Sequence, residues 1–376
     1  MAGYDIVDPE AIDAGRATAA YFLRTEAVLD HEGADPHVVA ELSVPDDRWY
    51  LLTGQAGVAR LLSGLPVDVD AAPDGTPVTG TPVLRIEGRY RAFARYESSL
   101  LGLLAHPSGV ATAAMACRAA AGDDTLLSFG TRRQHPALGA MVERAALVGG
   151  ADGIGNVAAG DLLGVEAGGT MPHALVVALG SPERAWRAFE EALPEDVPRT
   201  VVCDTFGDEA DEAGRAVAVL GDALDGVRID TPGSRRGDLR DIAADVRYEL
   251  DRRGREDVSI LVSGGIDPAA IDRLGDVADA FGVGAAIANA DPVDCSLNLV
   301  AVDGDPVAKR GVGRGAKAVY RDGVEDTVVP RSESAPGEPL MEPLLRDGEI
   351  VAEPDLDAAC ERAAEGLAAL RAAGEL

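Results

Sequence analysis

The sequence between Thr125 and about Ala288 repeats a short apolar segment, a polar or glycine-rich turn and an amphipathic helix. Repeated βα units of a single period build a parallel sheet, and their turns share one edge of that sheet. Fewer than eight apolar segments are clear, so we expect an irregular or incomplete α/β barrel of the TIM type. Active sites of such barrels are built from the turns that follow the strands, so we expect a site there.

Residues 1–100 have a different pattern. Residues 11–27 form a helix candidate, and three later segments are strand-like: 38–44, 49–52 and 83–88. These predict an α+β unit with an open sheet. Long helices are expected between residues 94 and 121, with a break at Pro107 and Gly109.

At 376 residues the chain exceeds the length at which one core keeps growing, so more than one domain is expected. The N-terminal α+β domain is expected over residues 1–105 and the α/β barrel over residues 106–289. Residues 290–376 are expected to return to the N-terminal domain and to end in an amphipathic helix over residues 355–373.

The charge balance argues against nucleic acid as a partner. The chain has 64 acidic and 34 basic residues, whereas a nucleic-acid binder would carry a basic patch. Lys309 and Lys317 are the only lysines. An acidic, lysine-poor surface is typical of proteins in concentrated salt, where the Debye length falls to about 3 Å and carboxylates repel one another less. We therefore expect a halophilic protein, over the alternative of an acidic mesophilic one.

Two further observations bear on location and metal content. No run approaches the roughly 18 apolar residues of a membrane helix, and the acidic N-terminus, residues 1–5, does not have the pattern of a signal peptide. The four cysteines lie far apart without a C-x-x-C pair, which argues against a local zinc ribbon or a disulfide framework. We expect a cytoplasmic protein with no membrane partner and no structural metal.

Glycine pairs follow two of the apolar segments. Gly264 and Gly265 precede a helix that begins near Asp267, and free N–H groups at such a turn suit a phosphate. Gly282 and Gly284 follow the next segment and could close the other side. The alternative is that each pair only permits a tight turn. Neither a Walker loop nor G-x-G-x-x-G occurs, which argues against P-loop and dinucleotide enzymes.

Two aspartates follow neighbouring strands of the repeat. Asp204 and Asp230 could bind Mg²⁺ through water or accept hydrogen bonds from sugar hydroxyls, and the alternative is that each caps a helix. Arg228 lies two residues before Asp230 and therefore on the same face of its strand. Burying an arginine and an aspartate inside a barrel is unfavourable unless the two charges pair with each other or serve a function. We therefore favour a functional role.

Cationic groups and one histidine complete the set. Arg132 and Arg133, with Arg235 and Arg236, give local positive charge on an anionic chain, which an anionic ligand requires. The alternative for Arg133 and Arg236 is pairing with surface carboxylates. His173 follows directly after a strand and could be a nucleophile, a proton carrier or a cap.

Together these segments resemble the nicotinate phosphoribosyltransferase family. The resemblance spans most of the chain in family order, and the set is specific although each member alone is not. The segments that carry it are Tyr21-Phe22-Leu23-Arg24-Thr25, Phe129-Gly130-Thr131-Arg132-Arg133-Gln134-His135-Pro136, Gly169 to His173, Val201 to Thr205, Val227 to Asp230, Ser263-Gly264-Gly265 and Ala308-Lys309-Arg310-Gly311.

The resemblance implies a type II phosphoribosyltransferase with an N-terminal α+β domain and an irregular barrel. It also implies a homodimer or higher homo-oligomer, usually head-to-tail, with shared active sites. The implied reaction joins nicotinate to phosphoribosyl pyrophosphate, with ATP coupling, and yields nicotinate mononucleotide and pyrophosphate for NAD synthesis.

The same resemblance implies roles for individual residues. Phe129 would stack on the pyridine ring, with Tyr21 of the partner subunit on its other face, and Arg228 would meet the nicotinate carboxylate. Arg132 and Asp230 would hold the phosphoribosyl part, and Mg²⁺ the leaving pyrophosphate. His173 matches the histidine that ATP-coupled relatives phosphorylate. The other substrate-binding candidates are Arg133, Thr170, Asp204, Ser263, Gly264 and Gly265 at the 5′-phosphate, Gly282 and Gly284.

The chain departs from the family pattern at two places. Members commonly have Ser-Gly-Asp after the aspartate equivalent to Asp230, and this chain has Thr231-Pro232-Gly233-Ser234, which changes the ribose and pyrophosphate contacts expected there. Archaeal relatives often carry a cysteine-rich zinc knuckle near the C-terminus. The corresponding residues 319–337 contain no cysteine, so no structural zinc is expected.

Three alternatives remain open at the level of sequence. The nearest is quinolinate phosphoribosyltransferase, which has the same architecture, an added decarboxylation and a need for more positive charge around a second carboxylate. Another is a non-catalytic homologue that binds a phosphoribosyl group or nucleotide. A third is an unrelated barrel enzyme that acts on a phosphorylated sugar.

Overall fold

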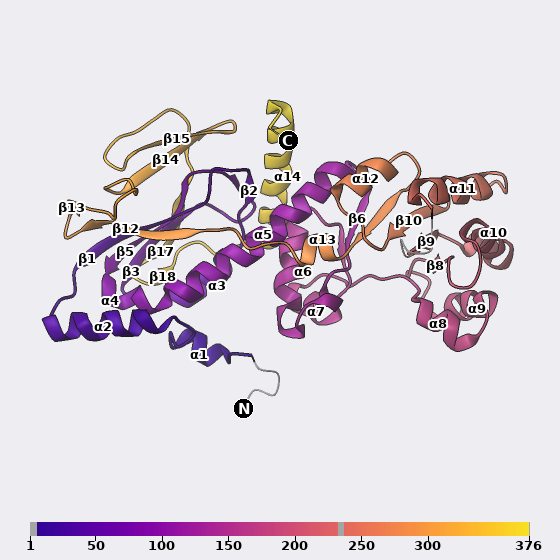
Figure 1. Ribbon diagram of the computed structural model, residues 1–376, viewed down its shortest axis with the longest axis horizontal. Coiled ribbons are helices and arrows are strands. Elements are labelled where there is room, and N and C mark those ends of the chain that lie inside the picture. The colour runs from indigo at the N-terminus through magenta and orange to yellow at the C-terminus, as the bar shows by residue number, and fades with distance from the viewer. Residues whose placement is uncertain (1–5, 232–236, 376) are drawn as a thin grey trace. The chain divides into compact units, whose positions relative to one another are not determined.

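A computed structural model describes residues 6–231 and 237–375 and divides the chain into two compact units (Figure 1). Unit 1 joins Met1–Met115 to Asp291–Leu376, and unit 2 is Ala116–Ala290. Arg235 and Arg236, with the rest of residues 232–236, lie outside the described residues.

Unit 1 is built on an antiparallel sheet with strand order β13-β12-β1-β5-β3-β17-β18. Within it, strand β1 pairs on one side with β5 and on the other with β12, where Leu42 lies opposite Leu297. The buried residues Leu42, Leu84 and Ile86 belong to the core under this sheet. The strands are β1 (His37–Ser43), β3 (Val67–Ala71), β5 (Pro82–Arg89), β12 (Ser296–Val302), β13 (Asp305–Pro306), β17 (Glu342–Arg346) and β18 (Glu349–Ile350).

Unit 1 also contains two minor sheets and several helices. Two minor sheets pair β2 (Tyr50–Leu51) with β4 (Pro77–Val78), and β14 (Lys317–Asp322) with β15 (Glu325–Pro330) and β16 (Glu338–Pro339). The helices are α1 (Pro9–Asp13), α2 (Ala20–Glu32), α3 (Gln55–Leu62), α4 (Tyr90–Phe93), the short 3-10 helix η1 (Ala94–Tyr96), α14 (Leu356–Ala373) and α5 (Glu97–Ala121), whose residues from Ala116 on belong to unit 2.

Two sequence-based expectations about helices are wrong. The helix expected over residues 11–27 is divided into α1 and α2, because the residues between them bond to α5 instead: the Ser99 hydroxyl donates to the Ala17 carbonyl. The break expected at Pro107 does not occur, since α5 runs through it. Ser108 exchanges hydrogen bonds with the backbone of Thr53, and such tertiary contacts offset the helix bond that proline removes.

The helical stretch Tyr90–Ala121 also corrects the expectation about apolar runs. It is long and apolar enough, by composition, to cross a membrane, with a mean hydropathy of 1.4 over an 18-residue window. Alanine, leucine and methionine raise this average although serine and glycine interrupt them. More than half of that window, 56%, is buried inside the protein, as in the core helix of a folded domain.

Unit 2 contains a curled parallel sheet with strand order β7-β6-β11-β10-β9-β8. Taken in a circle, this order follows the chain, with β11 closing onto β6 and an opening between β7 and β8. The expected irregular α/β barrel is therefore confirmed as a half-barrel. The strands are β6 (Thr125–Ser128), β7 (Gly153–Ile154), β8 (Thr200–Val202), β9 (Gly226–Ile229), β10 (Ser259–Ser263) and β11 (Ala280–Val283).

An irregular segment, residues 165–172, spans the opening between β7 and β8. At one end Ala167 forms a parallel bridge with Ile154, and the N–H of Gly168 donates to the Ile154 carbonyl. At the other end the N–H of Met171 donates to the carbonyl of Thr200 in β8. These bonds satisfy backbone groups that a closed barrel would pair between strands.

Helices follow the strands of the half-barrel. Single α-helices connect β6 to β7, β8 to β9, β9 to β10 and β10 to β11, whereas three lie between β7 and β8 and one follows β11. They are α6 (Gly139–Val148), α7 (Val157–Leu163), α8 (His173–Leu179), α9 (Pro182–Ala192), α10 (Glu209–Leu220), α11 (Leu239–Asp251), α12 (Pro268–Leu274) and α13 (Ala285–Ala288), with the 3-10 helices η2 (Thr131–Arg133), η3 (Pro136–Leu138) and η4 (Gly221–Ala223).

Candidate active site

A cavity of about 540 Å³ lies at the carboxyl ends of the parallel strands of unit 2. Its lining comes from the turns after β6, β7, β9, β10 and β11 and from the segment that spans the opening. The volume falls within the roughly 300–1,000 Å³ of small-molecule sites. The sequence-predicted residues that line it are Phe129, Arg132, Arg133, Thr170, Arg228, Asp230, Ser263, Gly264, Gly265, Gly282 and Gly284.

Phe129 provides an aromatic wall directly after β6. Its backbone N–H donates to the carbonyl of Val283 in β11, at 2.8 Å, which holds the residue against the closing strand. Its ring lies over Gly282, where an added Cβ would come within 2.5 Å of two ring carbons. Glycine at position 282 therefore allows the ring to approach the backbone of β11 closely.

Arg228 is held by neighbours on three sides. Its Nε donates to the Ser263 hydroxyl at 2.9 Å, and one terminal nitrogen, Nη1, donates to the Thr170 hydroxyl at 3.1 Å. The other terminal nitrogen donates to the Asp230 carboxylate at 2.5 Å. The side chain is only 12% exposed, and its guanidinium carbon lies 5.9 Å from the centre of the Phe129 ring. A guanidinium held in this way presents fixed donors to a ligand carboxylate.

Asp204 and Asp230 are joined by a hydrogen bond between a side chain and the backbone. The Asp204 carboxylate accepts the backbone N–H of Asp230 at 2.7 Å and the Thr231 hydroxyl at 2.8 Å. Burial raises the pKa of Asp204, against the effect of these hydrogen bonds. The alternative that each aspartate caps a helix is wrong, because Asp208 and Asp238 are the capping residues of α10 and α11.

His173 is the first residue of α8 and faces these two carboxylates. The strand expected directly before it is wrong, because residues 165–172 are irregular. Its Nε2 lies 3.5 Å from Asp204 Oδ1 and 3.8 Å from Asp230 Oδ2, while its Nδ1 lies 3.1 Å from the Thr205 hydroxyl. The imidazole is therefore oriented from both sides. His173 and Asp204 lie behind the cavity lining, next to Asp230, which belongs to it.

The glycine turn after β10 is open to the cavity, whereas the helix that follows is capped. Gly264 has a φ of +87°, and an added Cβ there would come within 2.5 Å of Asp230 Oδ1. The N–H of Ala270 is bonded to the Asp267 carboxylate at 2.8 Å. One N–H group at this helix start is therefore already bonded, and Gly264 and Gly265 are the part of this motif that lines the cavity.

Arg132 and Arg133 lie in η2, both exposed and both in the cavity lining. The turn is held from the β11 side by Gln134, whose amide donates to the carbonyl of Ala288 at 2.6 Å and to the Asn289 side chain at 2.7 Å. Two guanidinium groups at the mouth of the cavity create the local positive potential that an anionic ligand needs.

Tyr21 belongs to unit 1 and is described there. It lies on α2 with 59% of its surface exposed, and its ring centre is 4.3 Å from that of Phe22. An exposed aromatic ring on a helix surface is available for contact with another molecule.

Several lining residues escaped sequence reasoning. Gly155 follows β7, a strand of two residues that is too short to show an alternating pattern. Ala285 lines the cavity without a chemical signal of its own, and Thr131, part of the Phe129–Pro136 segment, was given no separate role. Glu143 lies beneath Thr131 and Gly155; a buried acidic residue in an apolar helix is the signal that could have identified it.

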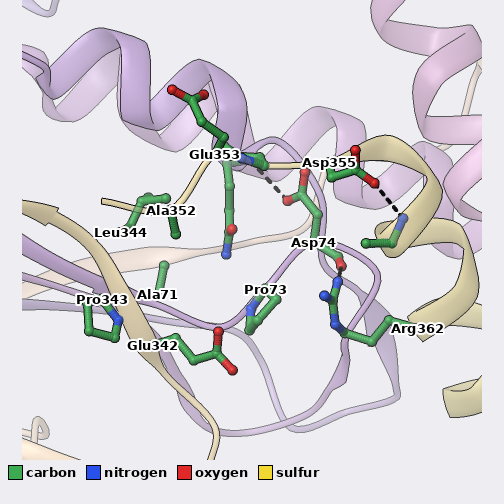
Figure 2. A pocket seen from close by; sticks show the side chains of 13 residues that line it. Ala71, Pro73, Asp74, Glu342, Pro343, Leu344, Ala352, Glu353, Asp355 and Arg362 are labelled. Carbon is green, nitrogen blue, oxygen red and sulfur yellow. Dashed lines mark hydrogen bonds between the residues drawn. The ribbon is translucent and has the colours of Figure 1, made fainter. Parts of the chain in front are cut away.

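A smaller cavity lies within unit 1, lined by Asp74, Glu353, Asp355 and Arg362 among others (Figure 2). Its polar groups bond largely to one another and to nearby backbone: Asp74 accepts the N–H of Gln55 at 3.0 Å, and Asp355 accepts that of Ala358 at 2.8 Å. Its volume of about 130 Å³ is below the range of small-molecule sites. The cavity of unit 2, which brings together the sequence-predicted residues at the ends of the parallel strands, is therefore the candidate active site. Within residues 6–231 and 237–375, no group of three or more His, Cys, Asp or Glu side chains is arranged to hold a metal ion.

Comparisons with known proteins agree on the family. The model of the quinolinate phosphoribosyl transferase C-terminal domain matches residues 110–298, and that of the N-terminal domain matches residues 19–108. The chain is 33% identical to a nicotinate phosphoribosyltransferase of Mycobacterium tuberculosis, covering 82% of this chain and 73% of that protein.

Solved structures give the same result for the fold. A nicotinate-nucleotide pyrophosphorylase from Pyrococcus furiosus is similar with a TM-score of 0.96 and 43% identity over 99% of both chains. Human nicotinic acid phosphoribosyltransferase is similar with a TM-score of 0.75 and 22% identity over 94% of both chains.

Proposed function

We propose a substrate and a mechanism for this chain, which belongs to the quinolinate phosphoribosyltransferase family, the type II phosphoribosyltransferases. As a member it is a transferase of NAD biosynthesis. The proposed reaction joins nicotinate to phosphoribosyl pyrophosphate and is coupled to ATP. Support for nicotinate comes from the curated relatives, which are named nicotinate phosphoribosyltransferases.

The observation that carries this proposal is the placement of Arg228 beside Phe129. An aromatic wall and a fixed guanidinium 5.9 Å from the ring centre suit a flat aromatic ring that bears one carboxylate. Asp230 already neutralises part of the Arg228 charge, so this corner of the cavity offers little for a second carboxylate. Nicotinate has one carboxylate and quinolinate has two.

The remaining cavity groups suit phosphoribosyl pyrophosphate. The open turn at Gly264 and Gly265 offers backbone N–H groups to the 5′-phosphate. Arg132 and Arg133 offer cationic donors to the pyrophosphate oxygens. Asp230 would accept hydrogen bonds from ribose hydroxyls, which orients the sugar against the ring bound at Phe129.

The chemistry needs positioning and charge stabilisation more than a base. The lone pair of the pyridine nitrogen forms a bond to C1 of the ribose, while the bond from C1 to pyrophosphate breaks and its oxygen keeps the electron pair. Positive charge develops on the sugar, and a fixed carboxylate such as Asp230 stabilises it. Arg132 and Arg133 stabilise the negative charge that pyrophosphate retains on leaving.

Magnesium fits this site as part of the substrate complex. Asp204 Oδ1 is a buried oxygen with no hydrogen-bond partner in the described ranges, and the other oxygen of the same carboxylate accepts the backbone N–H of Asp230. Two carboxylates of this kind would contact hydrated Mg²⁺ through water. Bound with phosphoribosyl pyrophosphate, Mg²⁺ would offset the charge of the leaving group. EDTA is expected to abolish turnover, and Mg²⁺ to restore it.

ATP coupling is assigned to His173. Thr205 and the two aspartates orient its imidazole, as a phosphate carrier requires. A ring nitrogen would attack the γ-phosphorus of ATP, forming an N–P bond as the P–O bond to ADP breaks. Tyr21 of the partner subunit is proposed to complete the nicotinate site in a homodimer or higher homo-oligomer. The location is proposed to be the cytoplasm, at high salt.

The second candidate is the decarboxylating reaction of quinolinate, and the names of the two matching family models favour it. The experiment that separates the two candidates supplies labelled nicotinate or labelled quinolinate with phosphoribosyl pyrophosphate, with and without ATP, in molar KCl. Formation of a nucleotide from nicotinate but not from quinolinate supports the proposal. Turnover of quinolinate but not of nicotinate replaces it with the second candidate.

A further inference from the structure

Glu143 is a fully buried acid directly beneath the candidate active site. It lies on α6 with no exposed surface, and burial raises the pKa of its carboxyl group against the hydrogen bonds that it accepts. A buried carboxyl without a function is unfavourable compared with an apolar side chain of the same size. Its position therefore calls for an explanation that packing alone does not provide.

The carboxyl group joins two turns of the cavity wall. Its Oε1 lies 3.3 Å from the Thr131 hydroxyl, after β6, and 3.4 Å from the N–H of Gly155, after β7. Ser128, the buried last residue of β6, is close enough to lower the pKa of this carboxyl. Thr131 and Gly155 both line the cavity, whereas Glu143 does not reach it.

Thr131 is the first residue of η2, the turn that carries Arg132 and Arg133. This turn is held from its other flank by Gln134, which bonds to the carbonyl of Ala288. Phe129 is held separately through its own backbone bond to Val283. Loss of the Glu143 contact would thus free the arginine turn on one side and leave the aromatic wall in place.

We propose that Glu143 is a positioning residue, which fixes Thr131 and thereby holds Arg132 and Arg133 where phosphoribosyl pyrophosphate binds. The inference rests on the proposed function only through phosphoribosyl pyrophosphate as the donor of the phosphoribosyl group that the family is named for. If Glu143 has this role, its loss should lower the affinity for phosphoribosyl pyrophosphate and leave the affinity for the base largely unchanged. A general loss of structure would lower both affinities together.

The test compares Glu143→Leu, Glu143→Gln and Thr131→Val with the unchanged chain. Glu143→Leu is expected to raise KM for phosphoribosyl pyrophosphate about tenfold, because even a small displacement of Arg132 and Arg133 weakens their contacts with this substrate. The KM for nicotinate should change less than about twofold. Thr131→Val should give the same separation, and the double variant should be no worse than either alone. Glu143→Gln keeps an accepting oxygen and should restore most of the affinity.

Asp152→Ala is the matched control. Asp152 accepts the N–H of Leu126 at 2.7 Å and so joins β6 to the start of β7, at the opposite end of the same strands from the cavity. This variant should lower the unfolding temperature without changing KM. Equal KM effects in Asp152→Ala and Glu143→Leu, or a Glu143→Gln variant as impaired as Glu143→Leu, would overturn the proposal.

Equilibrium dialysis of phosphoribosyl pyrophosphate with the same variants keeps this inference separate from the choice of base. If the chain makes no nucleotide from nicotinate, the proposed function fails, and dialysis still reports the contribution of Glu143. Unchanged binding in Glu143→Leu would overturn the inference even where nicotinate is turned over normally.

Discussion

The Arg228 guanidinium, in β9, and the Asp230 carboxylate, on the residue directly after this strand, lie 2.5 Å from each other at the cavity wall. Both side chains are largely buried, so neither charge is well solvated. The same guanidinium also faces the Phe129 ring. The pair therefore couples the proposed base-binding corner to the proposed ribose-binding corner, and substitutions on either side should affect both.

Arg228→Ala is expected to lower kcat/KM for nicotinate at least about 100-fold. The substitution removes the group proposed to bind the nicotinate carboxylate and leaves Asp230 as an uncompensated buried charge. Steady-state kinetics measure this. Arg240→Ala is the control, since Arg240 forms an exposed ion pair with Asp276 and should change activity little. A twofold effect or less in Arg228→Ala would remove Arg228 from the site.

Gly282→Ala is expected to raise KM for nicotinate about tenfold or more, because the added methyl group would displace the Phe129 ring. Gly275→Ala serves as the comparison: its added Cβ meets only an ordinary contact, 3.7 Å from the Ile271 carbonyl oxygen. The prediction fails if both alanine variants retain the nicotinate affinity of the unchanged chain.

His173→Ala is expected to abolish the stimulation of turnover by ATP and to leave slow ATP-independent synthesis. Assays with and without ATP measure the ratio, and γ-labelled ATP reports acid-labile phosphate on the protein. His31→Ala, on the exposed last turn of α2, should behave like the unchanged chain. Equal stimulation of the His173 variant would show that another group, or none, carries the phosphate.

Glu97 is expected to make unit 1 less stable as the pH rises. Burial raises its pKa from 4.5 to about 7, and the nearby Lys309 ammonium opposes the shift. Between these two values the folded chain holds a proton that the unfolded chain has lost, so stability falls as the pH rises from 4.5 to 7. Glu97→Gln should therefore raise the melting temperature at pH 8 by about a few degrees and change it little at pH 4.

Thermal melts at the two pH values test this prediction. The control is Glu361→Gln on the exposed face of α14. A Glu97→Gln variant with the same pH dependence as the unchanged chain would show that Glu97 ionises normally.

The parallel half-barrel and the edge that carries the site follow from local pattern. Apolar segments such as 259–262 stop at Ser263-Gly264-Gly265, and the ends of parallel strands have to meet at one edge. Residues that end strands, including Phe129, Arg228 and Asp230, were therefore predictable as neighbours. β3, with Val67 and Val69 buried and Asp68 exposed, alternates like a strand but was not recognised.

Other features depend on contacts that no local pattern encodes. Pro107 should end a helix on local grounds, and α5 continues because the loop at Thr53 bonds to Ser108. The opening between β7 and β8 and its filling by residues 165–172 depend on two backbone bonds between segments distant in sequence.

The sequence by itself determined the alternation of strands and helices, and with it which side chains stand at strand ends, because hydrophobic periodicity is a local property of the chain. Only the tertiary structure decided that Glu143 supports the arginine turn, that Gly282 makes room for the Phe129 ring, and that Asp204 bonds the backbone of Asp230 rather than capping a helix. The physical reason is that burial and hydrogen bonding between distant segments depend on how the strands are packed, which periodicity does not specify.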